Sequence, residues 1–176
     1  MLKKNLFFIL FLSQMLVFAQ KSSIPNTEAE FEKEYNSRIK KDRLFGVYIP
    51  KDMTDAFTRL DAIIEVKDRD RFKGLNEHDA QHRLYFSLNR WLIQNWGFYN
   101  GSRYSAYLKD VGVHHPEDMA MFTLLLYHRN LNKKPLQIKE AVEEIKERRK
   151  KEVEDRMKNA KVISEQIIKK EPKKKN

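Results

Sequence analysis

Helix start and stop signals follow one another between residues 47 and 135, without the alternation of apolar and polar residues that strands show. Residues suited to capping precede apolar residues spaced three or four apart, and Gly74, Gly97 and Gly112 end the runs. Pro116 stands where the first residue of a last core helix is expected. The pattern predicts an all-α fold, a small irregular bundle of four to five helices.

The longest helix predicted before Pro116 is capped by Asn76 and ends before Gly97. Shorter helices are expected after Asp52 or Thr54, after Asp68 and after Ser102. The apolar face of the helix that follows Asn76 is expected to carry Leu84, Leu88, Trp91 and Leu92.

One further helix is expected before the core, within residues 20–46. Thr27 and Glu30 have the spacing of a capping box, in which each side chain accepts a backbone hydrogen bond from the other residue. A narrow apolar stripe follows, made of Phe31, Tyr35 and Ile39.

A long charged helix is expected after the core, over residues 136–168. Its apolar residues keep a spacing of three or four, but the stripe is too thin for burial on several sides. Arg149 stands where a regular repeat requires an apolar residue. The helix is expected to lie along the core, to lie along a partner or to stand free. Residues 169–176 are a basic tail that we expect to be disordered.

Residues 1–19 have the pattern of a secretory signal peptide. Lys3 and Lys4 precede an apolar run, and Ala19 offers a cleavage site. The run from Leu6 to Phe18 is shorter than the roughly 20 residues that span a bilayer, although a retained N-terminal anchor is the alternative. The sequence predicts an exported protein, periplasmic or extracellular, with no transmembrane segment after signal cleavage.

Charge and cysteine content narrow the expected partners. The chain has no cysteine, so it has no disulfide and no thiolate chemistry. The formal charge of +10 falls to +8 without Lys3 and Lys4, and residues 136–176 hold 14 basic and 9 acidic residues. An exported chain rarely meets nucleic acid, so we expect none as partner. An unknown protein partner or an anionic surface, bound through residues 136–176, is expected instead.

Two groups of histidines could carry chemistry. His78 and His82 lie four residues apart, a spacing that can bind metal, but a solvent-facing first helical turn explains them better. His115 and Asp118 open the last core helix, and His128 lies about 20 Å further along it. Helix capping and tertiary hydrogen bonding explain these three residues, with a polar binding site as the alternative.

Asn95, Trp96 and Arg103 form another candidate site. An amide, an aromatic face and a guanidinium at a joint between helices could hold a carboxylate or a sugar ring. The alternative places Trp96 in the core and Arg103 on free carbonyl groups. No nucleophile with its base, no metal-ligand set and no glycine-rich phosphate loop stands out, so we assign no catalytic residue, no metal and no cofactor.

The core resembles a bacterial domain of unknown function, the DUF6794 type, over about residues 47–135. The resemblance rests on Tyr48-Ile49-Pro50-Lys51-Asp52 with Ala56-Phe57 and Leu60-Asp61, on Trp91 to Gly97, on Ser102-Arg103, on His115-Pro116-Glu117-Asp118-Met119 and on Tyr127-His128-Arg129. It implies no activity or cofactor. It does mark Asn95, Trp96, Gly97, Arg103, His115, Asp118 and His128 as positions that match the family's motifs.

Two classes of function are therefore open. The first is a non-enzymatic binding or interaction module with a polar patch around Arg103, His115 and Asp118. The alternative is a small hydrolase or metal-assisted enzyme using His115, Asp118 or His128, because histidine and aspartate near a helix start can have shifted pKa values. A structural or protective protein is a third possibility, to which no residue specifically points.

Overall fold

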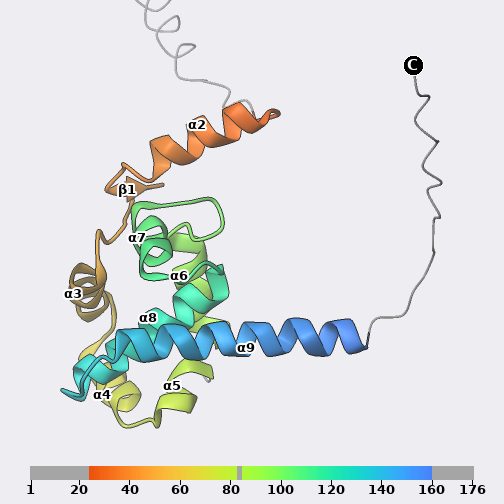
Figure 1. The fold of residues 1–176 in the computed structure, drawn as a ribbon. Coiled ribbons are helices and arrows are strands. Elements are labelled where there is room, and N and C mark those ends of the chain that lie inside the picture. The colour runs from red at the N-terminus through yellow and green to blue at the C-terminus, as the bar shows by residue number, and fades with distance from the viewer. Residues whose placement is uncertain (1–23, 83–84, 160–176) are drawn as a thin grey trace, which may run out of the picture.

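The computed structural model describes residues 24–82 and 85–159, and within them the chain is all-α apart from one short hairpin (Figure 1). The elements in chain order are α2 (Glu28–Arg38), β1 (Arg43–Leu44), β2 (Val47–Tyr48), α3 (Met53–Ile63), α4 (Val66–Lys73), α5 (Glu77–His82), the π-helical turn η2 (Tyr85–Asn89), α6 (Arg90–Asn95), α7 (Arg103–Val111), α8 (Pro116–Leu131) and α9 (Ile138–Lys158). The all-α prediction is confirmed, although the described part of the core has more helices than the four to five predicted.

Most of the predicted helix starts are confirmed. Thr27 accepts the hydrogen bond of the Glu30 backbone N–H, and both halves of the capping box of α2 are present. The side chain of Asp52 caps α3, and Ser102 caps α7. Pro116 is the first residue of α8. These signals act within one helical turn, which is why the sequence alone locates them.

Two of the local predictions are wrong. The side chain of Asp68 caps no helix, because α4 begins at Val66, and it pairs instead with Arg71. The helix predicted from Asn76 to Gly97 is divided into α5, η2 and α6. The buried side chain of Asn89 donates a hydrogen bond to the Gln81 carbonyl (3.0 Å), a group that a regular helix would bond to a backbone N–H.

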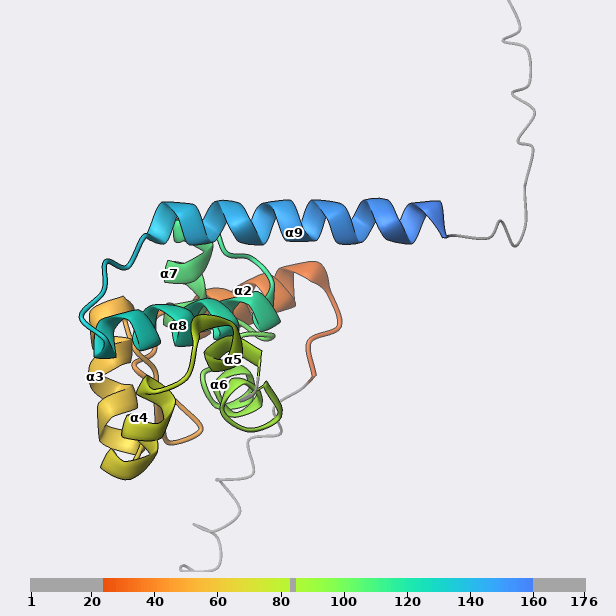
Figure 2. The ribbon, with the colours of Figure 1, turned by 90° about the horizontal axis from the view of Figure 1, so that it is seen from below.

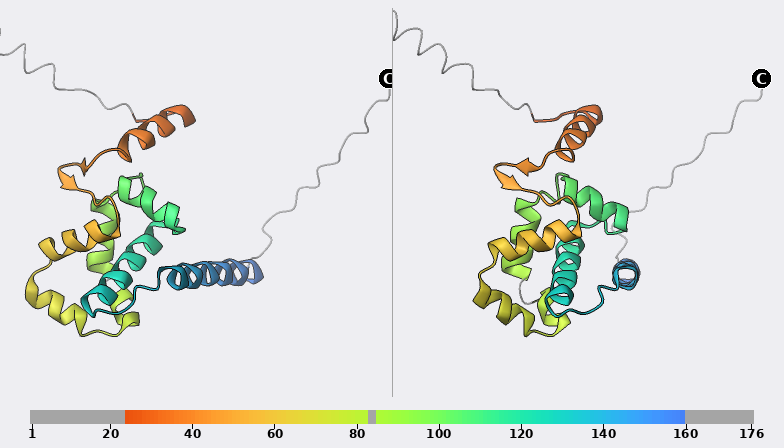
Figure 3. Two further views of the ribbon diagram at one scale, coloured as in Figure 1. Left: turned by 60° about the vertical axis from the view of Figure 1, so that its left-hand side comes forward. Right: turned by 90° about the vertical axis from the view of Figure 1, so that its left-hand side faces the viewer.

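Helix α8 lies at the centre of the bundle. Eleven of its sixteen residues are buried, so it is covered on most sides, unlike a surface helix with one apolar stripe. Helices α3 and α4, α5, α6 and α7 surround it (Figures 1 and 3). The largest side chains that are fully buried with it are Trp96, Tyr104, Tyr127 and Phe122.

The N-terminal helix α2 lies at the α7 end of the bundle, opposite α4 and α5 (Figure 1). Buried Arg38 donates from Nε to the carbonyl of Gly101 (3.1 Å), which holds the end of α2 on the connection between α6 and α7. Tyr35 lies against the same glycine, and the Lys109 ammonium is 4.8 Å from the centre of the Tyr35 ring.

Gly101 is expected to tolerate no side chain. Its φ is +86°, and a Cβ would lie 2.3 Å from Tyr35 Cδ2. We expect Gly101→Ala to reduce the free energy of unfolding by about 2–4 kcal/mol, since left-handed strain adds to overpacking. Gly46→Ala is the matched control, because Gly46 has a similar φ of +81° and open space around it. Urea denaturation of both variants measures the difference, and equal losses would contradict a role for Tyr35.

Helix α9 runs along one side of the bundle, and its C-terminal half extends beyond the other helices (Figures 1 and 2). Ala141 and Val142 in its first half are buried, whereas Val153 is 46% and Met157 72% exposed. Among residues 24–82 and 85–159, no helix combines the length and the apolar character that crossing a membrane requires.

Candidate functional site

Trp96 is a core residue. Its side chain is 0% exposed, and its ring meets the ring of Tyr104 edge to face with centroids 5.3 Å apart. The side chain of Asn95 donates to the Trp91 carbonyl one turn earlier (2.9 Å). Asn95 and Trp96 therefore present no shared binding face.

Arg103 holds the chain between β2 and α3. Its Nε donates to the Ile49 carbonyl (2.7 Å), and its guanidinium lies 5.0 Å from the centre of the Tyr48 ring. Asp55 completes the cluster by accepting hydrogen bonds from the Tyr48 hydroxyl (2.8 Å) and the Lys51 backbone N–H (2.9 Å). The first of these bonds raises the pKa of Tyr48. The cluster fastens the turn between β2 and α3, and Arg103 serves that turn through its bond to a backbone carbonyl.

His128 lies inside the bundle, whereas His115 is exposed at the N-cap of α8. His128 is 1% exposed, and its Nε2 lies 2.9 Å from the Leu75 carbonyl in the connection between α4 and α5. The ring edge of His128 packs against Phe72, with centroids 5.5 Å apart. These contacts hold α4 against the C-terminal end of α8. His115 lies at the opposite end of α8, so the structure does not bring His115 and His128 together.

Alanine substitutions distinguish the two histidines. His128→Ala is expected to reduce the free energy of unfolding by about 1–3 kcal/mol, because the Leu75 carbonyl loses its partner inside the protein. His115→Ala is expected to change it by less than about 0.5 kcal/mol, as is usual for exposed side chains. Melting temperatures of the two variants test this prediction. A destabilised His115→Ala or an unchanged His128→Ala would contradict it.

Asp118 is the one carboxylate among the candidate residues, and its partners come from α9. It is 1% exposed, and its two oxygens lie 2.5 Å from Arg148 Nη2 and 2.6 Å from Arg149 Nε. The hydrogen bond that Arg149 donates to Asp118 raises the pKa of Arg149. Glu152 lies on the other side of both arginines, 3.2 Å from Arg149 Nη1 and 3.8 Å from Arg148 Nε. We call these four residues the Asp118 cluster.

Glu117 adds a second carboxylate beside the Asp118 cluster. It accepts a hydrogen bond from the Tyr99 hydroxyl, and this bond lowers the pKa of Glu117. Negative charge in the first turn of α8 also lies favourably with respect to the helix dipole. The N-terminus of α8 thus presents two carboxylates, of which Asp118 is held by arginines from outside the bundle.

A second ion pair fixes the chain that leads into α9. Buried Arg129 donates to Glu77 Oε2 from Nη2 (2.8 Å), and its Nη1 donates to the Leu136 carbonyl (2.8 Å). This pairing lowers the pKa of Glu77, and Lys134 lies 3.3 Å from the same carboxylate. Neither pairing was predicted. The one sequence sign of either is Arg149, whose place in the apolar stripe of α9 is explained by its bond to Asp118.

An apolar groove of about 650 Å³ lies between α3, α4, η2 and α6. Its apolar lining consists of Ile63, Ile64, Phe72, Leu75, Leu88 and Trp91. The charged residues at its edge include Asp68 and Arg71, which pair with each other. None of the predicted candidate residues lines this groove.

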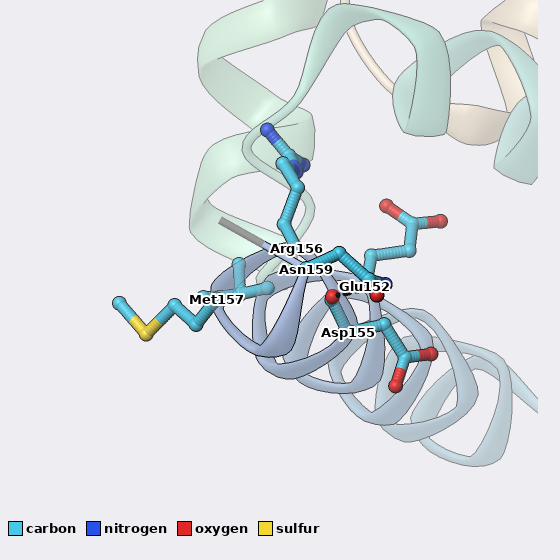
Figure 4. Close-up of a pocket in the computed structure, with 6 residues that line it drawn as sticks. Glu152, Asp155, Arg156, Met157 and Asn159 are labelled. Carbon is cyan, nitrogen blue, oxygen red and sulfur yellow. Dashed lines mark hydrogen bonds between the residues drawn. The ribbon is translucent and has the colours of Figure 1, made fainter. Parts of the chain in front are cut away.

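The exposed end of α9 is not an enclosed site. The side chains of Glu152, Asp155, Arg156, Met157 and Asn159 project to different sides of one helix (Figure 4). A hollow bordered by a single helix has one wall, so these residues do not surround a ligand.

The described residues contain no group of three histidine, aspartate or glutamate side chains placed to hold a metal ion. The side chain of His78 is 80% exposed, and that of His82 lies outside the described residues. The predicted candidate residues therefore do not form one site. Among them, Asp118 joins the bundle to α9 through the Asp118 cluster.

No curated protein and no solved structure matches the chain. Residues 49–131 match the family described as Domain of unknown function (DUF6794). The matched segment contains α3 to α8 and excludes α2 and α9. The helical domain formed by residues 49–131 is thus a match to the DUF6794 family.

Proposed function

We propose that the protein is an exported, non-enzymatic interaction module that attaches its DUF6794 domain to an anionic surface through residues 150–176. The observation that carries this proposal is the division of the C-terminal segment into two parts. The part that packs on the bundle has no net charge, and the part beyond it is strongly basic.

Residues 136–149 contain four basic and four acidic residues, whereas residues 150–176 contain ten basic and five acidic ones. The described beginning of the distal part has exposed Lys150, Lys151 and Lys158. A basic segment near an anionic membrane gains about 1 kcal/mol for each lysine or arginine close to the surface. The excess of five positive charges is therefore enough to hold a small domain on such a surface.

Export is supported by the signal-peptide pattern of residues 1–19, which lie outside the described residues. An exported protein, periplasmic or extracellular, meets anionic lipid headgroups and acidic glycans more often than nucleic acid. The basic distal segment suits such surfaces.

The proposal assigns no catalytic residue. His115 is exposed, Asp118 is paired with two arginines, and His128 is bonded to a backbone carbonyl at a distance from both. A hydrolase or metal-assisted enzyme would need two or more of these side chains to face one substrate. Their separate structural contacts favour the interaction module.

Sedimentation with lipid vesicles tests the proposal. The mature chain, residues 20–176, is expected to bind vesicles rich in phosphatidylglycerol at low salt and to bind pure phosphatidylcholine vesicles far more weakly. Changing the five tail lysines to glutamine is expected to weaken binding at least about 100-fold. These lysines are Lys169, Lys170, Lys173, Lys174 and Lys175.

A control variant removes the same charge from the body of the protein. It changes five exposed lysines to glutamine: Lys40, Lys41, Lys51, Lys67 and Lys73. We expect this variant to keep binding within a few-fold of the unchanged chain. Equal losses in both variants, or no binding by the unchanged chain, would overturn the proposal.

A further inference from the structure

The turn of the hairpin between β1 and β2 holds a phenylalanine in a conformation that this residue disfavours. Leu44 pairs with Val47 across the hairpin, so the turn has two central residues. These are Phe45 and Gly46, with φ angles of +50° and +81°. Positive φ at both positions is typical of a type I′ turn, in which Asn-Gly is a preferred sequence. Because a bulky side chain at positive φ is strained, the turn alone would favour asparagine at position 45.

The ring of Phe45 packs against little of its own fold. Its side chain is 91% exposed, and the Arg38 guanidinium lies 5.5 Å from the centre of the ring. The hairpin projects from the bundle in both views of Figure 3. Strained residues persist where the surrounding structure holds them for a purpose, and folding does not supply one for an exposed ring. The strain and the exposure together indicate a contact outside the fold.

The apolar groove between α3, α4, η2 and α6 can receive such a ring. Its volume of about 650 Å³ lies within the range of ligand pockets, roughly 300–1,000 Å³, and Phe72 and Trp91 line it beside four aliphatic side chains. The hairpin lies beside α2, at the end of the bundle opposite α4 (Figure 1). Phe45 therefore does not reach the groove of its own chain.

The charges beside the ring and at the groove are complementary. Exposed Lys40, Lys41 and Arg43 precede Phe45, with one acidic residue among them. The groove is bordered by the acidic residues Glu65 and Asp68 and by one basic residue. Opposite net charges favour the encounter of the two surfaces and orient them. One chain thus carries both an exposed aromatic ring and a groove that suits it in shape and charge.

We propose that Phe45 enters the apolar groove of a second copy of this chain, so that the protein self-associates through two different surfaces. Such a contact either is made twice in a dimer or continues from copy to copy. One ring and a few charges form a small interface, so the association is weak and reversible. It brings several basic C-terminal segments to one anionic surface, a consequence that rests on the proposed function.

Phe45→Asn separates this contact from the fold. Asparagine suits the turn, so the variant is expected to keep or raise the melting temperature while it removes the ring. Sedimentation of residues 20–176 from micromolar to millimolar concentration measures the association. We expect the average mass of the unchanged chain to rise with concentration and Phe45→Asn to weaken association at least about 10-fold, as for a buried aromatic anchor. Phe31→Ala is the matched control, because Phe31 is 58% exposed on α2, and it should leave association unchanged.

Blocking the groove is the second arm of the experiment. Ser87 is an exposed residue of the groove lining, so Ser87→Arg narrows the groove and adds a charge that repels the basic hairpin. Reversing the charges of Glu65 and Asp68 with lysine weakens the contact without altering an apolar side chain. Both groove variants should lose self-association at an unchanged melting temperature. A mixture of Ser87→Arg with Phe45→Asn should form a one-to-one complex, because one variant supplies the ring and the other supplies the groove.

Three results would overturn the proposal: an unchanged chain that stays monomeric, equal effects of Phe45→Asn and Phe31→Ala, or a mixture of Phe45→Asn and Ser87→Arg that stays monomeric. A monomeric chain whose vesicle binding is lost in Phe45→Asn would assign the ring to the bilayer and would also overturn the choice of a second copy. The sedimentation assay contains no lipid and leaves residues 150–176 unaltered, so its failure is distinct from failure of vesicle binding.

Discussion

Replacing both Arg148 and Arg149 with alanine is expected to lower the free energy of unfolding by about 3–5 kcal/mol, as when one side of a buried ion pair is removed. The reason is the unequal burial of the partners. Asp118 is 1% exposed, whereas the side chains of Arg148 and Arg149 are 35% and 30% exposed. Without the arginines, an almost fully buried carboxylate loses both of its charged partners.

The opposite substitution should be milder. Asp118→Asn leaves two arginines that can turn to water, and we expect a loss of about 1–3 kcal/mol. In the Arg148→Ala, Arg149→Ala background, Asp118→Asn should recover part of the stability, because no buried charge remains. Urea denaturation of the three variants measures these differences.

The control for these substitutions lies on the same helix. Lys150 and Lys151 are exposed and follow the two arginines directly, so changing both to alanine should alter stability by about 0.5 kcal/mol or less. If the arginine pair costs no more than the lysine pair, or if Asp118→Asn gives no recovery, the Asp118 cluster does not join α9 to the domain.

The parts of the fold that could be predicted from the sequence are those that depend on neighbouring residues. Four helices begin at the capping residues or the proline that predicted them: Thr27, Asp52, Ser102 and Pro116. Helix α7 ends at Gly112, which has the left-handed conformation. The resemblance to DUF6794 is confirmed as well, since the matched residues 49–131 lie within the predicted core. Local signals and a motif pattern were sufficient for both.

The features that sequence reasoning missed depend on contacts between distant residues. Residues Tyr85–Asn89 are π-helical, and the Asn89 side chain bonds to the Gln81 carbonyl. Periodicity registers neither feature. Asp118 and Arg149 are 31 residues apart, and Arg129 and Glu77 are 52 apart. A charged residue inside an apolar stripe, such as Arg149, is the one sequence signal that could have indicated a buried partner.

The candidate binding residues illustrate the same limit. Trp96 and Arg103 were expected either to bind a ligand or to serve the core, and the sequence favoured the core without excluding a site. The structure puts the ring of Trp96 among other rings and the guanidinium of Arg103 on a backbone carbonyl. Export and the function of the tail stay predictions, because residues 1–23 and 160–176 lie outside the described part of the chain.

Trp96→Ala should reduce the free energy of unfolding by about 3–5 kcal/mol, the range for removing a large buried aromatic side chain. Trp96 is 0% exposed and has ring neighbours in Trp91, Phe98 and Tyr104, with centroids 6.3, 6.4 and 5.3 Å away. Its Nε1 meets no hydrogen-bond partner among the described residues, so the loss comes from packing. For a chain of this size, the melting temperature should fall by about 10 °C.

Trp91→Ala is the matched control, because Trp91 is the other of the two tryptophans in the chain and is only partly buried, in the lining of the apolar groove. We expect it to be clearly less destabilising than Trp96→Ala. If Trp96 instead served a ligand at the expense of stability, its replacement would leave the melting temperature level or raise it. Thermal unfolding of the two variants therefore decides whether Trp96 serves the core or a binding site. A large drop in melting temperature confined to Trp96→Ala assigns the Asn95-Trp96-Gly97 segment to the fold. An unchanged melting temperature of Trp96→Ala would make the segment a binding candidate again.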